Sequence, residues 1–472
     1  MTYAEALAAL DRLTNFERAP NPEAMRAVRL ERMQRLCARL GDPQRRFRSV
    51  LVSGTNGKGS ICAMLYSMLR ESALRVGLYT SPHIEDVRER IRWWTGPRPA
   101  GRAHGDDWIG KDDFAAMFEQ LAPALEATRQ EWSDSPPTYF EALTALAFLA
   151  FHWRRIEIAV LEVGLGGRLD ATNVVAPAVS VFGPIAVDHP AVLGRDPASI
   201  AREKSGIIRP GQAALTVPQS PEVLAVLREA CEACCAPLYV CGQDLTAGIN
   251  HHGLDGLQMT LTGLRGIYQS VDLPLLGRHQ AANAAVAVGA LEALSGAGVP
   301  QSLVERGLAQ VQWPGRTELL HDAPLVILDG AHNPHAAAAL RDTLAELCHG
   351  RAVHLLMGLS ADKAVQEVAA LLAPRAASIT CTTSRHPRAL EPIALAEALA
   401  AHCVDVRVMA DPVDAYTYLL NAIPPEDVLV VTGSLFLVGE LRAALRQSHV
   451  KPRRSAPLEA VISDDDPPPA MA

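Results

Sequence analysis

The sequence is poor in aromatic residues and has no long apolar run. Aromatic residues make up 5% of the 472 residues, and alanine and leucine are abundant, which favours helix-rich α/β structure over an all-β sandwich. The longest strongly apolar stretch, residues 142–151, is shorter than the ~20 residues that span a bilayer. The first residues, Met1–Glu5, lack the basic start and apolar core of a signal peptide. We therefore expect a cytoplasmic protein without a membrane partner.

An excess of positive charge is also missing. The formal net charge of -8 argues against a protein whose main partner is a nucleic acid. Four of the nine cysteines cluster between residues 231 and 241, but no second Cys-x-x-Cys pair or histidine pair completes a zinc site. We therefore interpret the cysteines as ordinary reduced thiols. Small anionic substrates then require positive charge that is supplied locally.

The chain is long enough for two or three domains. In its first half, short β-branched strands alternate with helices such as residues 58–71 and 139–152, which predicts a parallel sheet covered on both faces. The expected strands are residues 49–52, 76–79, 157–163 and 179–182. A glycine-punctuated stretch at residues 242–276 then indicates a small antiparallel element.

A turn-forming break at Trp313–Arg316 separates this half from a second alternating series of strands and helices. We predict an α/β protein with an N-terminal, P-loop-ATPase-like, mostly parallel sheet domain and a smaller C-terminal Rossmann-like domain. The predicted domain limits are 1–312 and 319–448, with a linker at 313–318. The Pro-, Asp- and Ser-rich residues 449–472 predict a disordered tail.

A glycine-rich segment lies directly between the first expected strand and its helix. Its residues are Gly54, Thr55, Asn56, Gly57, Lys58, Gly59 and Ser60. The glycines allow backbone N–H groups to point at phosphate oxygens, and the helix start adds positive potential. Lys58 can neutralise phosphate charge and Ser60 can reach a metal ion. The pattern departs from G-x-x-x-x-G-K-[ST], because the first glycine is closer and Gly59 separates Lys58 from Ser60. It predicts a phosphate-binding loop, and the family resemblance given below makes it a nucleotide site.

Three polar residues follow other strands at their carboxyl ends: Ser81, Glu162 and His189. Ligands gather at this edge of an open α/β sheet, so these side chains are expected to converge on the glycine-rich segment. A buried carboxylate such as Glu162 needs a partner or an ion, and Mg²⁺ prefers hard oxygen ligands. Taken alone, His189 is more often a structural histidine and Lys204 a solvated lysine.

The ordered set of motifs resembles the bifunctional dihydrofolate synthase/folylpolyglutamate synthase family of the Mur ligase superfamily. Beyond the glycine-rich segment, the resemblance rests on residues 80–83, 161–173, 188–189, 201–208, 277–283, 314–316, 329–334 and 432–435. It implies an ATP-dependent ligase that adds L-glutamate to dihydropteroate and to the γ-carboxylate of reduced folates through an acyl phosphate. It also implies a monomer whose partners are small molecules only: pteroate or folate, L-glutamate and ATP.

The resemblance further implies roles for individual residues. Catalysis would involve Lys58, Lys204 and His189. Two magnesium ions would be held by Ser60, Ser81, Glu162, His189 and a carbamylated Lys204. Further ATP contacts would come from Asn283, Arg316, Asp329 and His332. Arg316 suits phosphate because its planar fork gives paired charged hydrogen bonds, although these residues could instead form a salt bridge at the domain interface.

For the pterin end, the resemblance implies contacts from Thr138, Tyr139, Phe140, Glu141, Leu169, Asp170 and Ala171. Aromatic faces can stack a flat heterocycle, but Tyr139 and Phe140 alone would be interpreted as core. Two segments depart from the family pattern: residues 93–110 are longer than usual, and residues 14–21 match loosely. The alternatives are a Mur-type ligase acting on a peptidoglycan precursor, a non-catalytic nucleotide-binding module and a phosphotransferase.

Overall fold

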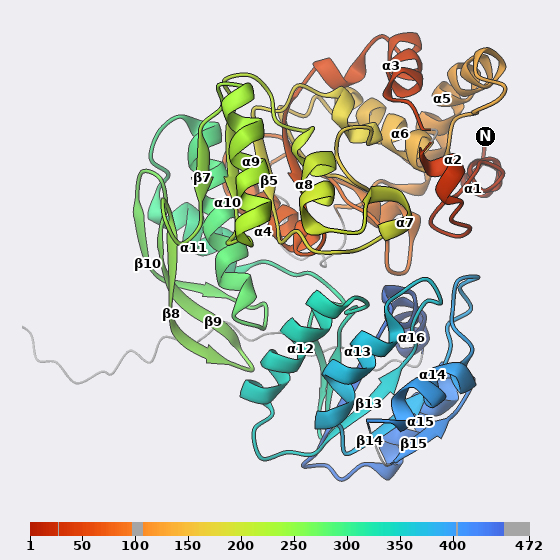
Figure 1. The fold of residues 1–472 in the computed structure, drawn as a ribbon. Helices are drawn as coiled ribbons and strands as arrows, with labels where there is room; N and C mark the ends of the chain where they lie inside the picture. Colours follow the sequence, from red (N-terminus) through yellow and green to blue (C-terminus); the bar gives the residue numbers. More distant parts are fainter. Residues whose placement is uncertain (27, 97–106, 403–404, 448–472) are drawn as a thin grey trace, which may run out of the picture.

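The structure is a computed structural model that describes residues 1–26, 28–96, 107–402 and 405–447. The predicted disordered tail at residues 449–472 and the centre of the long 93–110 segment lie outside the described residues. Two α/β halves lie one above the other in Figure 1, the first coloured red to green and the second cyan to blue. The predicted fold class is confirmed, while the predicted domain limits stay a prediction.

A seven-stranded sheet forms the centre of the first half, in the order β3-β2-β4-β1-β5-β6-β7. The central strands are apolar and buried on both faces, as parallel strands covered by helices usually are. Neighbouring strands are parallel except for β3, which runs antiparallel to β2 at the edge and was not expected. The strands are β1 (Arg48–Ser53), β2 (Val76–Tyr79), β3 (Ile91–Trp94), β4 (Ile158–Glu162), β5 (Val179–Phe182), β6 (Ala213–Thr216) and β7 (Leu238–Val240).

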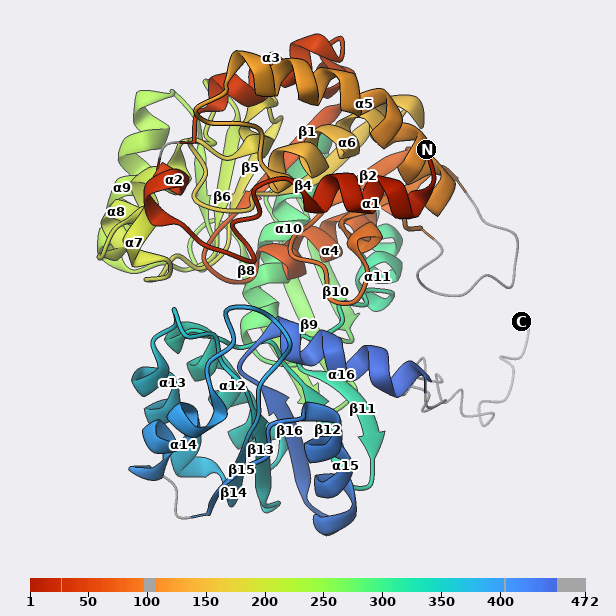
Figure 2. The same ribbon diagram turned by 90° about the vertical axis from the view of Figure 1, so that its right-hand side faces the viewer.

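Helices cover one face of this sheet, and helices together with a small second sheet cover the other (Figure 2). An apolar cluster fills each of the two interfaces. One face packs against α1 (Tyr3–Asp11), α3 (Leu30–Arg39), α5 (Lys111–Glu131), α6 (Tyr139–Trp153), α8 (Pro197–Ser205) and α9 (Pro221–Ala233). The other packs against α4 (Lys58–Arg70), α10 (His279–Ser295), α11 (Gln301–Ala309) and an antiparallel sheet of β8 (Thr246–Gly253), β9 (Gly256–Thr262) and β10 (Ile267–Leu273). That small sheet confirms the prediction for residues 242–276. Short helices complete this half: α2 (Pro22–Arg26), α7 (Pro190–Leu193), η1 (Pro43–Arg45), η2 (Val87–Arg90) and η3 (Ala171–Val174).

The second half is built on a six-stranded sheet, in the order β11-β12-β16-β13-β14-β15. It is parallel apart from the edge strand β11, which pairs antiparallel with β12. The strands are β11 (Glu318–Asp322), β12 (Leu325–Leu328), β13 (Val353–Met357), β14 (Ser378–Cys381), β15 (Val406–Val408) and β16 (Val428–Thr432). The helices are α12 (Pro334–Leu347), α13 (Val365–Leu372), α14 (Pro392–Ala400), α15 (Pro412–Ala422), α16 (Leu435–Gln447) and the short η4 (Ala373–Arg375).

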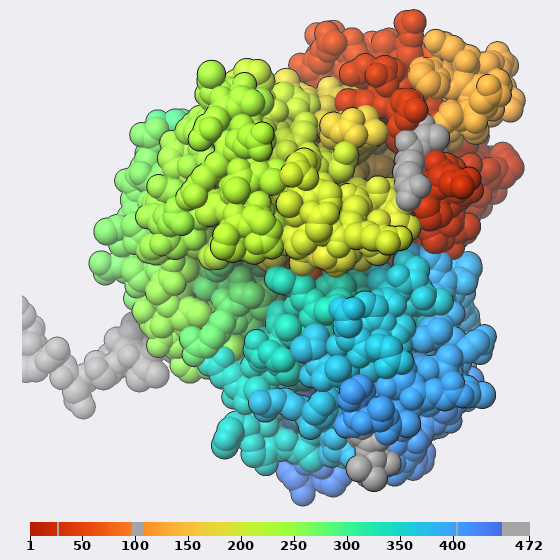
Figure 3. Space-filling model, viewed as in Figure 1, coloured from red at the N-terminus to blue at the C-terminus, as the bar shows by residue number. Residues whose placement is uncertain are grey.

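The two halves meet along a seam through the middle of the molecule (Figure 3). Lys363 of the second half forms an ion pair with Asp188, which follows β5 of the first half, at 2.7 Å. Arg442 of α16 pairs with Glu85 at 3.0 Å. The carboxyl end of β5 therefore faces the second half. Within the described ranges, none of the helices combines the length and the apolar character that a membrane crossing requires.

Candidate active site

A large cavity lies between the two halves and receives side chains from both. Its lining contains nearly all the residues that the sequence singled out: Gly54, Thr55, Asn56, Gly57, Lys58, Gly59, Ser60, Ser81, Thr138, Phe140, Glu141, Glu162, Leu169, Asp170, Ala171, His189, Lys204, Asn283, Arg316, Asp329 and His332. Segments more than 200 residues apart in the chain thus meet at one cavity. The expectation that the strand-end residues converge on the glycine-rich segment is confirmed.

Tyr139 is the exception among the expected site residues. It is 4% exposed and belongs to the apolar core, with the Arg90 guanidinium 5.6 Å from its ring centroid. Adjacent residues on a helix point in different directions, so Phe140 faces the cavity while Tyr139 faces the core. The expectation that Tyr139 stacks on a pterin is therefore corrected.

The glycine-rich segment, Gly54–Ser60, connects β1 to α4 and is held by the end of β5. Thr55 N donates to Pro184 O at 2.7 Å, and Thr55 Oγ1 donates to Ala186 O at 2.8 Å. Gly54 has φ +147°, and a Cβ there would lie 3.0 Å from the Gly183 backbone, so glycine is required. The loop backbone is therefore fixed before any phosphate binds.

Two lysines converge on one carbonyl at the mouth of this loop. Lys58 Nζ donates to Gly54 O at 3.2 Å, and Lys204 Nζ, from α8, donates to the same oxygen at 2.8 Å. Burial, together with the charge of Lys58, lowers the pKa of Lys204 to about 7. Lys58 thus supplies positive charge for a polyanion such as a nucleotide phosphate, while the neighbouring Lys204 amine is only partly protonated near neutral pH.

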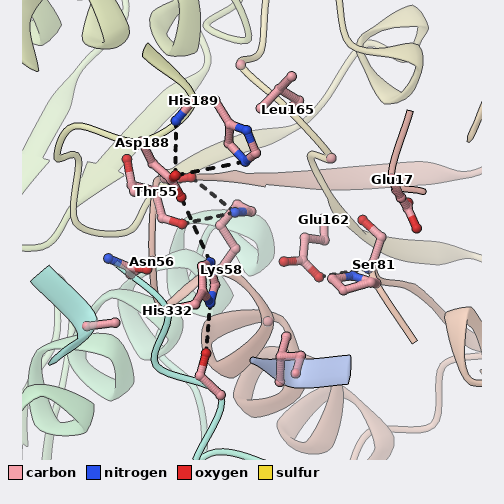
Figure 4. Close-up of a pocket in the computed structure, with 18 of the residues that line it drawn as sticks. Glu17, Thr55, Asn56, Lys58, Ser81, Glu162, Leu165, Asp188, His189 and His332 are labelled. Carbon is pink, nitrogen blue, oxygen red and sulfur yellow. Dashed lines mark hydrogen bonds and ion pairs between the residues drawn. The ribbon is translucent and has the colours of Figure 1, made fainter. Parts of the chain in front are cut away.

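Glu162 ends β4 and is 5% exposed. Its Oε2 accepts a hydrogen bond from Ser81 N at 3.0 Å. Burial raises the pKa of this carboxyl, against the lowering effect of the Lys58 and Arg316 charges. Figure 4 shows Glu162 beside Ser81, with Lys58 next to it in the cavity. A buried carboxylate with so little compensation fits a hard divalent cation such as Mg²⁺.

The other expected metal ligands are more dispersed. Ser60 lies in the first turn of α4 and its Oγ accepts from Gln280 Nε2 at 3.5 Å. His189 lies across Lys58 from Glu162 in the view of Figure 4, and burial lowers its pKa to about 4, which leaves the imidazole neutral. Among the described residues, no three His, Cys, Asp or Glu side chains form a metal site by themselves. Any ion here would take much of its coordination from phosphate and water, as Mg²⁺ usually does.

Two expected ligand contacts prove to be carboxylates that hold turns. Asp170 accepts from Leu165 N at 2.9 Å and from Thr172 N at 3.0 Å. Asp329 accepts from Thr317 N and from Ala331 N, both at 2.8 Å. Burial raises the pKa of both carboxyls, and these donors oppose the rise. These hydrogen bonds fix each carboxylate in the cavity wall, and a ligand contact from either residue stays a prediction.

Thr138 and Glu141 form the N-terminal capping box of α6. Glu141 Oε1 and Oε2 also accept from Arg32 Nε and Nη2 at 2.9 and 2.7 Å, and Arg32 is 1% exposed. A pterin edge would therefore have to displace Arg32 to pair with this carboxylate. The capping box and the ion pair explain the conformation of the Thr138–Glu141 segment. Phe140 is the aromatic side chain of this segment that lines the cavity.

Arg316, in the predicted linker, carries a charge that no described residue neutralises through an ion pair. Within the described ranges it makes no hydrogen bond or ion pair, although the carboxylates of Glu162 and Asp329 lie close enough to feel its charge. It lines the cavity next to the glycine-rich segment. A guanidinium without a protein partner, at the end of a phosphate-binding loop, suits a phosphate contact.

Sequence reasoning missed the network that joins the two halves at the cavity edge. Asp188 pairs with Lys363 and accepts from Asn333 Nδ2 at 3.3 Å, and Asn333 also donates to Asn56 Oδ1 at 3.0 Å. Burial alone would raise the pKa of Asp188, but the charge of Lys363 outweighs it and holds that pKa well below its usual range. Lys363 follows the carboxyl end of β13, so the strand-end rule that found Glu162 could also have found it.

Glu17 was also missed, because its segment matches the family pattern only loosely. It lines the cavity and receives both terminal nitrogens of Arg90, at 2.8 and 2.5 Å. The same guanidinium donates Nε to His83 at 2.9 Å. This ion pair between the buried Arg90 and the half-buried Glu17 holds the amino-terminal segment against the rest of the first half.

Comparisons with known proteins agree with this architecture. The Mur ligase middle domain matches residues 112–291, and the glutamate ligase domain of Mur ligases matches residues 315–435. The dihydrofolate synthase/folylpolyglutamate synthase of Bacillus subtilis is 34% identical over 424 residues, covering 88% of this chain and 95% of that protein. The protein of the same name from Mycobacterium tuberculosis is 35% identical over 454 residues, covering 89% and 91%.

Solved structures resemble the whole fold. The Mycobacterium tuberculosis folylpolyglutamate synthase complexed with ADP superposes with a TM-score of 0.84 at 33% identity, covering 96% of this chain and 99% of that one. Escherichia coli FolC in complex with DHPP and ADP gives a TM-score of 0.82 at 29% identity, covering 95% and 98%. The chain therefore belongs to the dihydrofolate synthase/folylpolyglutamate synthase family of Mur ligases.

Proposed function

We propose that this protein is an ATP-dependent ligase that adds L-glutamate to dihydropteroate and to the γ-carboxylate of reduced folates, releasing ADP and phosphate. The observation that carries the proposal is the pair Lys58 and Lys204 on one loop carbonyl, within a cavity that both halves line. The names of the Bacillus and Mycobacterium relatives and the DHPP and ADP complex of the Escherichia coli protein support it. A cytoplasmic location and a monomeric state stay predictions.

The chemistry follows from the poor reactivity of a carboxylate toward amines, since its oxygen is a poor leaving group. A carboxylate oxygen of the substrate attacks the γ-phosphorus of ATP, the bond to the bridging oxygen breaks, and ADP and an acyl phosphate form. The glutamate amine then attacks the acyl carbon, phosphate leaves, and the proton lost by nitrogen passes to solvent. Lys58 and Arg316 stabilise the charge on the transferring phosphoryl group. Closure of the two halves keeps water from the acyl phosphate.

The cofactor proposal is that Glu162, Ser60 and Ser81 hold one magnesium ion and that His189 and a carbamylated Lys204 support a second. When bound, magnesium neutralises phosphate charge. A neutral Lys204 amine can add carbon dioxide, forming an N–C bond and releasing a proton. The resulting carbamate would replace repulsion between Lys58 and Lys204 by attraction. The lowered pKa of Lys204 and its burial support this modification.

The substrate proposal places the pteroate ring system along the wall that carries Phe140, Leu169 and Ala171. The Phe140 ring packs over Gly164, where a Cβ would lie 2.5 Å from Cζ. Incoming glutamate would meet the second half, where Lys363 and Arg388 line the cavity. Their positive charges suit its two carboxylates.

The test is substrate-dependent ADP release with ATP, magnesium and L-glutamate, run in parallel with dihydropteroate, tetrahydrofolate and a muramyl-peptide precursor. We expect release, with a new glutamyl product by mass spectrometry, for dihydropteroate and tetrahydrofolate. Turnover of the muramyl precursor alone would favour the Mur-type alternative. A stable phosphorylated product formed without glutamate would identify a phosphotransferase instead.

A further inference from the structure

A cation lies between two indole rings behind the glycine-rich segment. The Arg92 guanidinium, on β3, is 5.7 Å from the Trp108 ring centroid and 5.4 Å from the Trp313 ring centroid. Trp108 belongs to the segment 93–110 that departs from the family pattern, and Trp313 is the first residue of the predicted linker. This Trp108–Arg92–Trp313 stack therefore joins two parts of the chain that the proposed mechanism does not use.

Trp313 covers the first turn of α4. A Cβ at Gly59 would lie 2.8 Å from both Nε1 and Cζ2 of its indole, so the ring and the Gly59 backbone are in direct contact. Gly59 immediately precedes Ser60 and follows Lys58. The start of the linker is thus packed on the phosphate-binding turn of the first half.

Trp313 contacts the first half, whereas the linker residues that follow Pro314 are bonded to the second half. Gly315 O accepts from Gly330 N at 2.9 Å, and Thr317 N donates to Asp329 at 2.8 Å, so both belong to the second half. Gly315 and Thr317 also have positive φ angles, +69° and +47°. Arg316 lies between these two attached residues, and Pro314 is the residue that connects them to Trp313.

The other ring of the stack is fixed independently of the linker. Ile109 N donates to Ile91 O at 2.9 Å, and Trp93 N donates to Asp107 O at 3.0 Å, so this stretch extends the sheet beyond β3. Asp107 Oδ2 accepts from Tyr66 OH of α4 at 3.1 Å. Trp108 is therefore anchored both to the sheet edge and to the helix that begins at the phosphate loop.

We propose that the Trp108–Arg92–Trp313 stack positions the start of the linker, Trp313 and Pro314, against the glycine-rich phosphate loop of the first half. Arg316 and Lys58 then reach the same nucleotide when the halves close. The inference rests on the proposed nucleotide site. The three described side chains of the stack do not line the main cavity. They line a smaller cavity behind it that also contacts Gly59, Glu162 and Arg316.

The chain offers a matched control. Arg154, at the end of α6, lies over Trp93 at 4.7 Å and over Trp153 at 4.2 Å, and it pairs with Asp113. This second cation between two indoles lies outside both cavities. Arg92→Leu and Arg154→Leu therefore each remove a cation from between two indoles, with and without a connection to the linker, and Arg154→Leu also removes the ion pair with Asp113.

The experiment compares magnesium-ADP binding by titration calorimetry, together with the KM for ATP and for glutamate. We expect Arg92→Leu to raise the Kd for ADP and the KM for ATP by roughly 3- to 10-fold, from the strength of such contacts. The KM for glutamate should change less, Arg92→Lys should restore part of the affinity, and Arg154→Leu should lower only the melting temperature.

The proposal is overturned if Arg92→Leu binds ADP as tightly as the unaltered protein, or if Arg154→Leu weakens binding equally. Trp108→Phe provides a milder change should Arg92→Leu not fold, and it should loosen ADP binding without loss of melting temperature comparable to Arg154→Leu. If the unaltered protein binds no magnesium-ADP, the proposed function itself fails. If the unaltered protein binds magnesium-ADP and substitutions in the stack do not change the Kd, only the proposal about the stack fails.

Discussion

Charged side chains at the two ends of the cavity differ in the number of their hydrogen-bond partners within the protein. At the phosphate end, formed by Gly54–Ser60, Glu162, Lys204 and Arg316, charged groups have few protein partners. At the turn end, formed by residues 138–141 and 164–173, carboxylates accept several hydrogen bonds each. Family resemblance assigned ligand contacts to both ends alike. The count of hydrogen-bond partners separates groups left available for a ligand from groups that hold the wall.

This difference predicts opposite consequences of substitution. Buried charges that lack partners cost folding free energy, so removing one at the phosphate end should impair the reaction without destabilising the fold. A buried pair at the turn end leaves an uncompensated charge when one partner is removed, which is strongly destabilising. Activity and stability should therefore respond separately at the two ends.

The largest effect on activity is expected for Lys58→Met. Loss of the charge that stabilises the transferring phosphoryl group should lower kcat by about 1,000-fold. The melting temperature should hold or rise, because Lys204 loses a like-charged neighbour. Substrate-dependent ADP release and thermal unfolding measure the two quantities. Full activity of this variant would show that Lys58 does not stabilise the transferring phosphoryl group.

Glu162→Gln should follow, with kcat lowered by about 100-fold. The amide keeps the size of the side chain and can still accept from Ser81 N, but it removes the anionic oxygen. The magnesium concentration for half-maximal rate should therefore increase, which a titration at saturating ATP detects. An unchanged magnesium requirement would show that Glu162 serves only to hold Ser81.

A smaller, pH-dependent effect is expected at Lys204. Its pKa of about 7 means that roughly 10% of the amine is neutral at pH 6 and roughly 90% at pH 8. Only the neutral amine adds carbon dioxide, so raising the pH through 7 favours carbamate formation. After removal of carbon dioxide, reactivation at equal dissolved carbon dioxide should be about tenfold faster at pH 8 than at pH 6.

The matched control for this measurement is Lys204→Gln, which cannot form a carbamate. It should have a low rate that bicarbonate does not change at either pH. Bicarbonate-independent activity of the unaltered protein after exhaustive removal of carbon dioxide would contradict the modification.

The sequence predicted the phosphate end well because that end depends on local geometry. A strand, a glycine turn and a helix place Lys58 and Ser60, and the strand-end rule places Glu162 and His189 on the same edge. The antiparallel edge strands β3 and β11 were missed, since each depends on pairing with a neighbour rather than on its own pattern.

The turn end was predicted less well because its side chains depend on distant partners. Nothing near Glu141 in the chain indicates that Arg32, 109 residues away, occupies its carboxylate. Likewise, helical periodicity alone did not settle which of Tyr139 and Phe140 faces the cavity. The link between Asp188 and Lys363 spans 175 residues, so only the folded arrangement of the two halves brings it into view.

The smallest effect on activity, and the largest on stability, is expected for Glu141→Gln. Arg32 is 1% exposed, and loss of its carboxylate partner should cost about 3 kcal/mol of unfolding free energy. At a temperature where the variant is folded, kcat should remain within about threefold of the original, since the interaction does not change in the transition state.

The double variant Arg32→Met with Glu141→Leu tests the comparison between the two ends most directly. Replacing a buried ion pair by apolar side chains of similar volume is often neutral, so this variant should recover most of the lost stability and keep its activity with dihydropteroate. A stable double variant with activity lowered by about 100-fold or more would show that Glu141 contacts the substrate. The turn end would then resemble the phosphate end, and the number of hydrogen-bond partners would no longer distinguish a wall from a binding site.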